Sequence, residues 1–249
     1  PDAHTIAPMP VTIMLAAAML SMGTYGILRF PMSLFTRDQL AGFSLPMMIM
    51  GAVSVIYGGL MALAERDIKR IIAYSSVSQM GYVLFGLGTF THDGIIGGTV
   101  HVIYHAIIKA LLFIVTGQVI YATGRRYLKD LGGLLNALPA VAASAVIGVL
   151  AIAGTPPLPE FDSEWMIFSG GFQTDYIAVT VITLLGSVLT VAYAFWFGGR
   201  IFFGSSPPDL EVKPLPLSMV IPGVLLAILA ILAGIFPASV FAWAEYEFS

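Results

Sequence analysis

The stretch GIIGGTVHVIYHAIIKALLFIVTGQVIYATG, residues 94–124, decides the fold of this chain. It contains no aspartate, glutamate or arginine, and Lys109 is its only strong base. A helix needs about 20 apolar residues to cross the hydrocarbon core of a bilayer. The stretch is longer than that, so it predicts a transmembrane helix that tilts, bends or protrudes.

Three titratable bases lie inside this apolar stretch: His101, His105 and Lys109. A spacing of four residues turns a helix by about 40°, so the three side chains share one stripe. A charge at bilayer depth costs at least about 2.5–3.5 kcal/mol on insertion scales, so the stripe indicates that the chain handles protons or cations. A buried lysine can both bind and release a proton, because desolvation disfavours the charged form that an exposed lysine keeps at neutral pH. A neutral histidine can relay a proton through either ring nitrogen.

Two other interpretations of the stripe stay open. Its polar groups could simply bond neighbouring helices. Two histidines four residues apart could also share a metal ion, but no third ligand is evident near them and Lys109 would oppose a cation. We therefore expect no metal site.

The composition places the chain among polytopic membrane proteins. It is 58% hydrophobic and only 10% charged, whereas a soluble domain is about 25% charged. The charges lie in loops and form no basic patch, so we expect no nucleic-acid partner. The absence of cysteine excludes disulfides, thiolate metal sites and cysteine-bound iron–sulfur clusters. We expect no cofactor in this chain, and any electron transfer to occur in partner chains.

The predicted fold is all-α, with about seven transmembrane helices in one transmembrane domain, 1–249. The segments that are long and apolar enough are 10–28, 42–63, 71–90, 94–122, 135–172, 176–203 and 217–243. The fifth is interrupted by GTPPLP at 154–159, and prolines so close together cannot remain in one regular helix. It therefore predicts a broken helix with halves near 137–153 and 161–172.

Loop charges predict the orientation of the chain. The loops at 64–70, 123–134 and 200–216 hold most of the basic residues, and the opposite side holds only Arg29 and Arg37. The positive-inside rule then makes the basic side cytoplasmic. We expect a cytoplasmic N-terminus, an external C-terminus and a location in a prokaryotic cell membrane. Because residue 1 is proline, we do not expect it to be the natural start.

The third span carries a polar face made of Ser75, Ser78, Gln79 and Tyr82, which recur every three or four residues. This face could hold a chain of water molecules or could bond neighbouring helices. Lys69, one turn before it, could form the cytoplasmic mouth of a path or could serve only as a topogenic charge.

Acidic residues follow the predicted break. Glu164 runs directly into an apolar segment, so we expect it inside the membrane on the outward side of the break. Glu160 and Asp162 could belong to a wet loop or could form a cation site, because broken spans that line a cavity often bind ions. We expect His4 to be a loop residue at the cytoplasmic surface.

Several strings resemble those of the antiporter-like family of membrane subunits. They are DIKR at 67–70 with AYSSVSQMG at 73–81, HVIYHAIIKALLF at 101–113, LGGL at 131–134 and GTPP at 154–157. This family comprises the proton-pumping membrane subunits of respiratory complex I and their homologues in Mrp-type antiporters, membrane-bound hydrogenases and related archaeal complexes. The resemblance covers nearly the whole chain.

The resemblance implies a fold of about fourteen helices with two inverted five-helix repeats, each containing one broken helix. This chain looks like helices eight to fourteen. Segment 10–28 would then be the last helix of the first repeat, 42–203 the second repeat and 217–243 the terminal helix. A partner chain or segment would supply the missing first repeat within a multi-subunit membrane complex.

The resemblance also implies which residues form the ion path. The family's central and exit-path titratable residues correspond to Lys69, His101, His105, Lys109 and Glu164. Two departures stand out, since Ser21 replaces a lysine or histidine of several members and the acidic stretch 160–164 replaces one containing glycine or asparagine. The glutamate and lysine of the first repeat are absent with their helices.

These observations predict a proton- or cation-translocating subunit of a complex-I-like assembly. Lys109 would be the central proton carrier of one half-channel, and Glu164 would deliver the proton outward. One alternative is a Na⁺/H⁺ antiporter subunit of an Mrp-type complex, in which Glu160, Asp162 and Glu164 bind Na⁺. Another is a structural subunit with a vestigial path.

Overall fold

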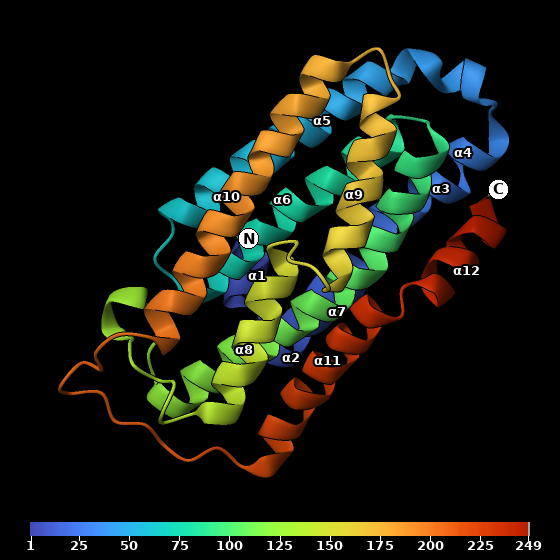
Figure 1. Cartoon of the computed structure of the whole chain (residues 1–249). Helices are drawn as coiled ribbons and strands as arrows, with labels where there is room; N and C mark the ends of the chain where they lie inside the picture. Colours follow the sequence, from blue (N-terminus) through green and yellow to red (C-terminus); the bar gives the residue numbers. More distant parts are fainter. Residues whose placement is uncertain (249) are drawn as a thin grey trace.

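The computed structural model describes residues 1–248, without the side chains at positions 37, 38, 247 and 248. The described chain is helical and contains no β-strand, apart from an isolated bridge between Asp67 and Tyr127. Its long helices run roughly side by side along one bundle axis (Figure 1). The prediction of an all-α polytopic membrane protein is confirmed.

Six helical segments of the described chain are long and apolar enough to cross a membrane. The first, Met9–Leu34, consists of α2 (Met9–Met14), the π-helical η1 (Leu15–Met19), α3 (Met22–Arg29) and α4 (Pro31–Leu34). The others lie in α5 (Arg37–Ala64), α6 (Ile68–Gly88), α7 (His92–Thr123), α10 (Ile177–Phe202) and α11 (Leu217–Ile235). These segments match the predicted spans, except at the chain ends and at the broken helix.

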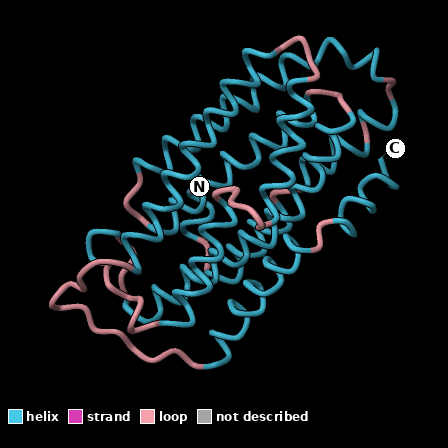
Figure 2. Tube along the Cα trace, viewed as in Figure 1, coloured by secondary structure: helices cyan, strands magenta, loops and turns pink. Residues whose placement is uncertain are grey.

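The broken helix is present as two short helices. α8 (Pro139–Ile152) and α9 (Pro159–Phe172) follow one another beside α7, joined by the proline-rich segment between them. Figure 2 shows this non-helical segment inside the bundle, well away from both of its ends. Pro159 takes the first position of α9, where the missing N–H costs no hydrogen bond. The break therefore lies where a continuous helix would have crossed the bundle.

Both ends of the chain differ from the predicted single spans. The segment 217–243 is divided into α11 and α12 (Ala238–Phe248), because Pro237 has no N–H and disfavours helical backbone at Phe236. A short helix, α1 (Asp2–Ile6), precedes the first span and packs on α6.

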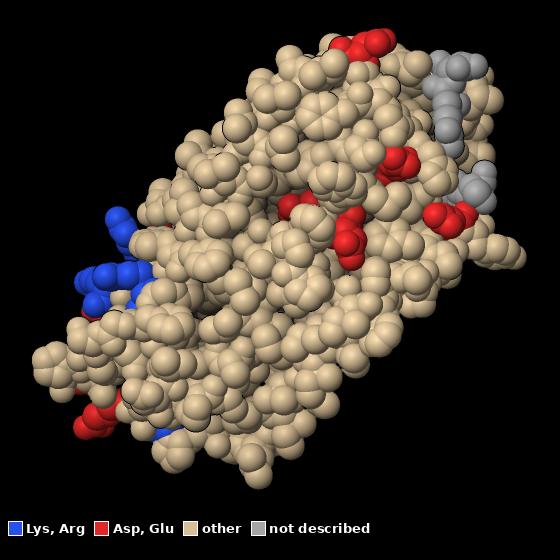
Figure 3. Space-filling view, in the orientation of Figure 1, with Lys and Arg blue, Asp and Glu red and all other residues tan. Residues whose placement is uncertain are grey.

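The basic loops meet at one end of the bundle. Ile68 N–H donates to the carbonyl of Arg126 at 3.0 Å, and Gly133 N–H donates to the carbonyl of Phe203 at 3.3 Å. η2 (Leu128–Asp130) lies in the same group of loops. On the face shown in Figure 3, lysine and arginine appear only towards this end. The basic loops thus lie at one end of the bundle, in agreement with the charge asymmetry of the sequence. That this end faces the cytoplasm stays a prediction.

α7 is the central helix and approaches α9 at backbone distance. A Cβ atom added to Gly170 would lie 2.4 Å from the backbone nitrogen of Gly94, and one added to Gly97 would lie 2.8 Å from the nitrogen of Ile167. Small residues allow such close approach between membrane helices. The glycines of α7 and α9 therefore set the position of the broken helix against the stripe of bases.

Candidate functional site

The stripe on α7 is buried inside the bundle. His101 and Lys109 are 0% exposed and His105 is 1% exposed. The two imidazole rings stack, with centroids 6.0 Å apart and planes inclined by 9°. The predicted common face is present, and it is directed towards other helices of the bundle.

Lys109 donates its ammonium hydrogens to α6. Its Nζ lies 2.8 Å from the carbonyl oxygen of Ile72 and is also hydrogen-bonded to Ser75 Oγ. Ser75 in turn donates its hydroxyl hydrogen to the Ile72 carbonyl at 2.9 Å. Hydrogen bonds from a charged donor are stronger than neutral ones, so this arrangement stabilises the protonated lysine inside the protein.

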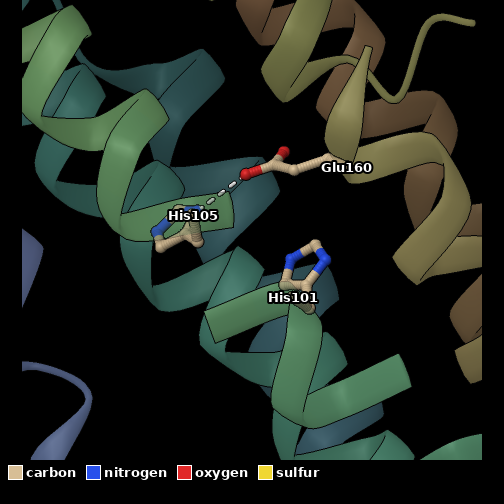
Figure 4. Close-up of side chains that lie close together, drawn as sticks. All are labelled: His101, His105 and Glu160. Atoms are coloured by element: carbon tan, nitrogen blue, oxygen red, sulfur yellow. Dashed lines mark hydrogen bonds and ion pairs between the residues drawn. The ribbon is translucent and has the colours of Figure 1, made fainter. Parts of the chain in front are cut away.

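His105 faces an acid on the broken helix. Its Nδ1 lies 3.0 Å from Glu160 Oε1, and Figure 4 shows Glu160 reaching from the start of α9 towards the ring. Glu160 is 0% exposed, so the wet-loop interpretation of this residue is wrong. Neither His105 Nε2 nor Glu160 Oε2 has a hydrogen-bond partner among the described residues. The pair can therefore exchange a proton and still has one free polar atom on each side.

His101 is held by two neutral side chains. Its Nε2 lies 3.1 Å from Gln79 Oε1, and its Nδ1 lies 2.9 Å from Ser163 Oγ. Gln79 donates its Nε2 hydrogen to the carbonyl of Ile152 at the end of α8, at 3.1 Å. Because that carbonyl can only accept, the amide must present its oxygen to His101, and His101 Nε2 must carry a hydrogen. Ser163 has one hydroxyl hydrogen, which it can donate to the carbonyl of Glu160 at 3.0 Å or to His101 Nδ1, so Nδ1 is the nitrogen that can gain or lose a proton.

Glu160 also supplies the third potential metal ligand that the sequence did not reveal. One ligand atom each from His101, His105 and Glu160 lie within 4.8 Å of one another. Both nitrogens of His101 are already engaged, and Lys109 lies one turn beyond His105 on the same stripe. The contacts fit a hydrogen-bonded network better than a metal centre.

Glu164 lies on the same face of α9 as Glu160, one turn further along. Its Oε2 would be only 2.8 Å from a Cβ added to Gly154, which has the positive φ of 62° in the break. Glu164 is 8% exposed, and its Oε1 has no hydrogen-bond partner in the described part of the chain. Asp162 lies two residues from each glutamate, on the opposite side of α9, and is only half-buried.

The polar face of α6 is divided between several neighbours. Ser75 and Gln79 contact the stripe, whereas Ser78 donates its hydroxyl hydrogen to the carbonyl of Val55 on α5 at 3.1 Å. Tyr82 packs edge-on against His101 and lies 3.4 Å from the hydroxyl of Thr190 on α10. Ser78 therefore bonds two helices together and does not face the stripe.

Lys69 lies at the end of α6 nearest the basic loops. Its Nζ donates to the carbonyl of Ala7 at 2.6 Å, in the segment that follows α1. It also lines a cavity of about 750 Å³ between this segment, α7 and α11. A buried lysine beside a cavity is suitably placed for the mouth of an ion path.

His4 is buried against α7 at the basic end of the stripe. It was expected in a surface loop, but it is 5% exposed and stacks on Phe113, with ring centroids 5.5 Å apart. Phe113 is four residues beyond Lys109, so His4 extends the same stripe. Burial lowers the pKa of His4, which favours its neutral ring. The residues around His4 give no local signal of this burial, because it depends on how α1 packs against the bundle.

Comparisons with known proteins find relatives over nearly the whole chain. The family described as "NADH:quinone oxidoreductase/Mrp antiporter, TM" matches residues 1–190. NADH-quinone oxidoreductase subunit M of Pseudomonas aeruginosa is 34% identical over 243 residues, which cover 96% of this chain and 47% of that protein. The chain thus spans about half the length of this relative.

Solved structures show the same fold. A chain of the membrane-bound sulfane sulfur reductase, an archaeal respiratory membrane complex, superposes with a TM-score of 0.88 at 34% identity, covering 95% of this chain and 41% of that one. A chain of the Mrp complex from Dietzia sp. superposes with a TM-score of 0.88 at 21% identity, covering 95% and 52%, and supports the fold alone.

Proposed function

The chain belongs to the NADH:quinone oxidoreductase/Mrp antiporter transmembrane family, and on that premise we propose that it translocates protons as one half-channel of a larger membrane complex. Lys109 carries the proton at the centre of this half-channel. The observation that carries the proposal is the fully buried Lys109 ammonium, bonded to Ser75 and followed on the stripe by His105 and His101. Ionisable residues inside membrane spans are rare and commonly mark ion or proton pathways.

The proposed path runs from the basic end of the bundle to the far side of the break. Protons reach the bundle near Lys69, pass Ser75 and load Lys109. The contacts of His105 with Glu160 and of His101 with Ser163 then offer two bridges from α7 to α9. Glu164 delivers the proton beyond the break, towards the external side.

The half-channel operates with partners. A chain or segment resembling the first repeat supplies the groups whose charge drives Lys109 between its protonated and neutral states. Electron transfer takes place in other subunits, and this chain holds no redox cofactor. We place the complex in a prokaryotic cell membrane, with the basic end of this chain in the cytoplasm.

Gln79 is proposed to keep a hydrogen on His101 Nε2, which leaves Nδ1, beside Ser163, as the nitrogen that exchanges a proton. Gln79→Leu should slow pumping at least about tenfold, because a hydrogen bond to a group that becomes charged contributes about 1.5–3 kcal/mol. The measurement is the initial rate of proton movement by the complex in vesicles, driven by its own electron donor.

Gln118→Leu provides the matched control. Gln118 is a buried glutamine that donates to the carbonyl of Met219 at 2.6 Å, an interhelical bond of the same kind with no histidine beside it. Equal slowing in both variants would mean that Gln79 acts only as a helix-to-helix bond.

A sodium-coupled variant of this function is the second candidate. It is favoured by the two buried carboxylate oxygens, Glu160 Oε2 and Glu164 Oε1, that make no hydrogen bond to a described group on the inner face of α9. Carboxylate oxygens without a hydrogen-bond partner beside a helix break could serve as ligands for Na⁺. Asp162, on the other face, is not part of this pair.

Glu164→Gln distinguishes the two candidates. If Glu164 relays protons, the variant loses proton pumping whether or not Na⁺ is present, because an amide cannot exchange the proton. If Glu164 binds Na⁺, sodium-dependent activity is lost while proton movement survives. Pumping should be measured in vesicles with sodium or choline salts at equal ionic strength. Full proton pumping by the variant would remove Glu164 from the proposed path.

A further inference from the structure

A pocket of about 410 Å³ opens at the basic end of the bundle, far from the stripe. It lies between the α5–α6 loop, the η2 region and the last turns of α10, and is lined by Arg66, Tyr127, Leu128, Lys129, Trp196 and Arg200. Three of these six side chains are cationic and two are aromatic. The pocket therefore concentrates positive charge next to amphipathic rings.

The three cations of this pocket have no acidic partner among the residues that the structure describes. Arg66 instead lies over the ring of Trp196, 5.3 Å from its centroid. Like charges that share a pocket repel one another, and an anion between them would remove that repulsion.

Neighbouring cations at the same end behave differently. Arg70 pairs with Glu65 at 2.8 Å, Arg125 pairs with Asp209 at 2.9 Å, and Arg126 pairs with Asp67. The Arg125 guanidinium also lowers the pKa of Asp209, so this acid is ionised and engaged elsewhere. Glu65, Asp67 and Asp209 are thus paired with cations outside the pocket, whereas Asp130 and Glu211 form no ion pair with a described residue.

An apolar groove is lined by the same last turns of α10 as the cationic pocket. It has a volume of about 290 Å³ and runs between α8 and α10, where its lining includes Val146, Phe195, Gly199 and Phe203. A Cβ added to Gly199 would meet nothing within 4 Å, so the missing side chain helps to keep the groove open. Gly199 directly precedes Arg200, so the groove and the pocket both involve the last turns of α10.

We propose that this end of α10 binds an anionic phospholipid. The phosphate lies among Arg66, Lys129 and Arg200, and one acyl chain occupies the α8–α10 groove. Tryptophan and tyrosine favour the level of the lipid headgroups, and lysine or arginine next to a membrane attracts anionic lipids. A soluble anion would use only the cationic half of the site, whereas a phospholipid uses both halves. This proposal does not rest on the ion path.

The test is retention of anionic lipid by the intact complex. The complex is reconstituted in vesicles of phosphatidylcholine or of an equal mixture with phosphatidylglycerol, extracted again, and analysed by native mass spectrometry for bound phosphatidylglycerol. Replacing Arg66, Lys129 and Arg200 together with glutamine should remove one tightly held phosphatidylglycerol per complex. Lys213→Gln at the same end should retain it.

Two further arms separate the alternatives. Gly199→Leu fills the groove without changing a charge, and should weaken retention at least several-fold. Inorganic phosphate added at the same concentration should not displace the lipid. Unchanged retention in both the triple variant and Gly199→Leu would overturn the proposal. So would displacement by phosphate combined with normal retention in Gly199→Leu, which would identify a simple phosphate site.

Discussion

Replacing Gly170 with valine should remove most of the folded chain from the membrane. Gly170 on α9 faces Gly94 on α7, and an added Cβ would lie 2.4 Å from the Gly94 nitrogen and 2.6 Å from Thr91 Oγ1. Gly94 belongs to the backbone of α7 and Thr91 caps the same helix, so neither residue can move aside without displacing the start of α7. We expect a loss above about 3 kcal/mol, at the upper end of overpacking effects. The measurement is the yield and thermal midpoint of the extracted complex.

Gly42→Val in α5 is the matched control. A Cβ at Gly42 meets nothing within 4 Å, so this substitution changes helix propensity alone and should alter stability by less than about 1 kcal/mol. Equal yields of the Gly170 and Gly42 variants would show that α7 and α9 do not need their close approach.

Lys109→Met should abolish most proton pumping while the complex still assembles. Methionine has nearly the length of lysine and fills the same buried space, but it cannot bind a proton or donate to Ile72 and Ser75. We expect the rate of proton movement to fall at least tenfold, which corresponds to about 1.4 kcal/mol or more in the barrier. A pH-sensitive dye in vesicles containing the complex reports this rate.

Lys109→Arg and Lys213→Met complete the Lys109 experiment. Arginine keeps the positive charge but does not release its proton in proteins, so a carrier role predicts a loss close to that of methionine. Lys213 is an exposed base, and its replacement should leave pumping unchanged. If arginine supports full pumping, a fixed charge suffices at position 109 and proton exchange there is not required.

The spans and the break could be predicted from the sequence because they depend on local properties. Apolar length identifies a membrane helix, and the prolines after Gly154 must interrupt one. The halves of the broken helix were predicted within two residues of α8 and α9. Phe236 and Pro237 also interrupt a helix, but a single proline near the end of an apolar segment is a weaker signal.

The partners within the site could not be predicted, because they depend on how helices far apart in the sequence pack. Spacing placed His101, His105 and Lys109 on one stripe. It gave no sign that His105 would meet Glu160, 55 residues away, or that Gln79 would connect His101 to the carbonyl at the end of α8. A wet loop was a possible place for Glu160 because it lies just beyond the break, whereas Pro159 begins a helix that buries it.

The ratio of protons moved to electrons transferred tests the central claim most directly. It should be measured in the intact complex carrying Lys109→Met and in its parent, at matched electron flow. If Lys109 is the proton carrier of this half-channel, the ratio falls in the variant. An unchanged ratio would contradict the account and leave the buried stripe with a structural role.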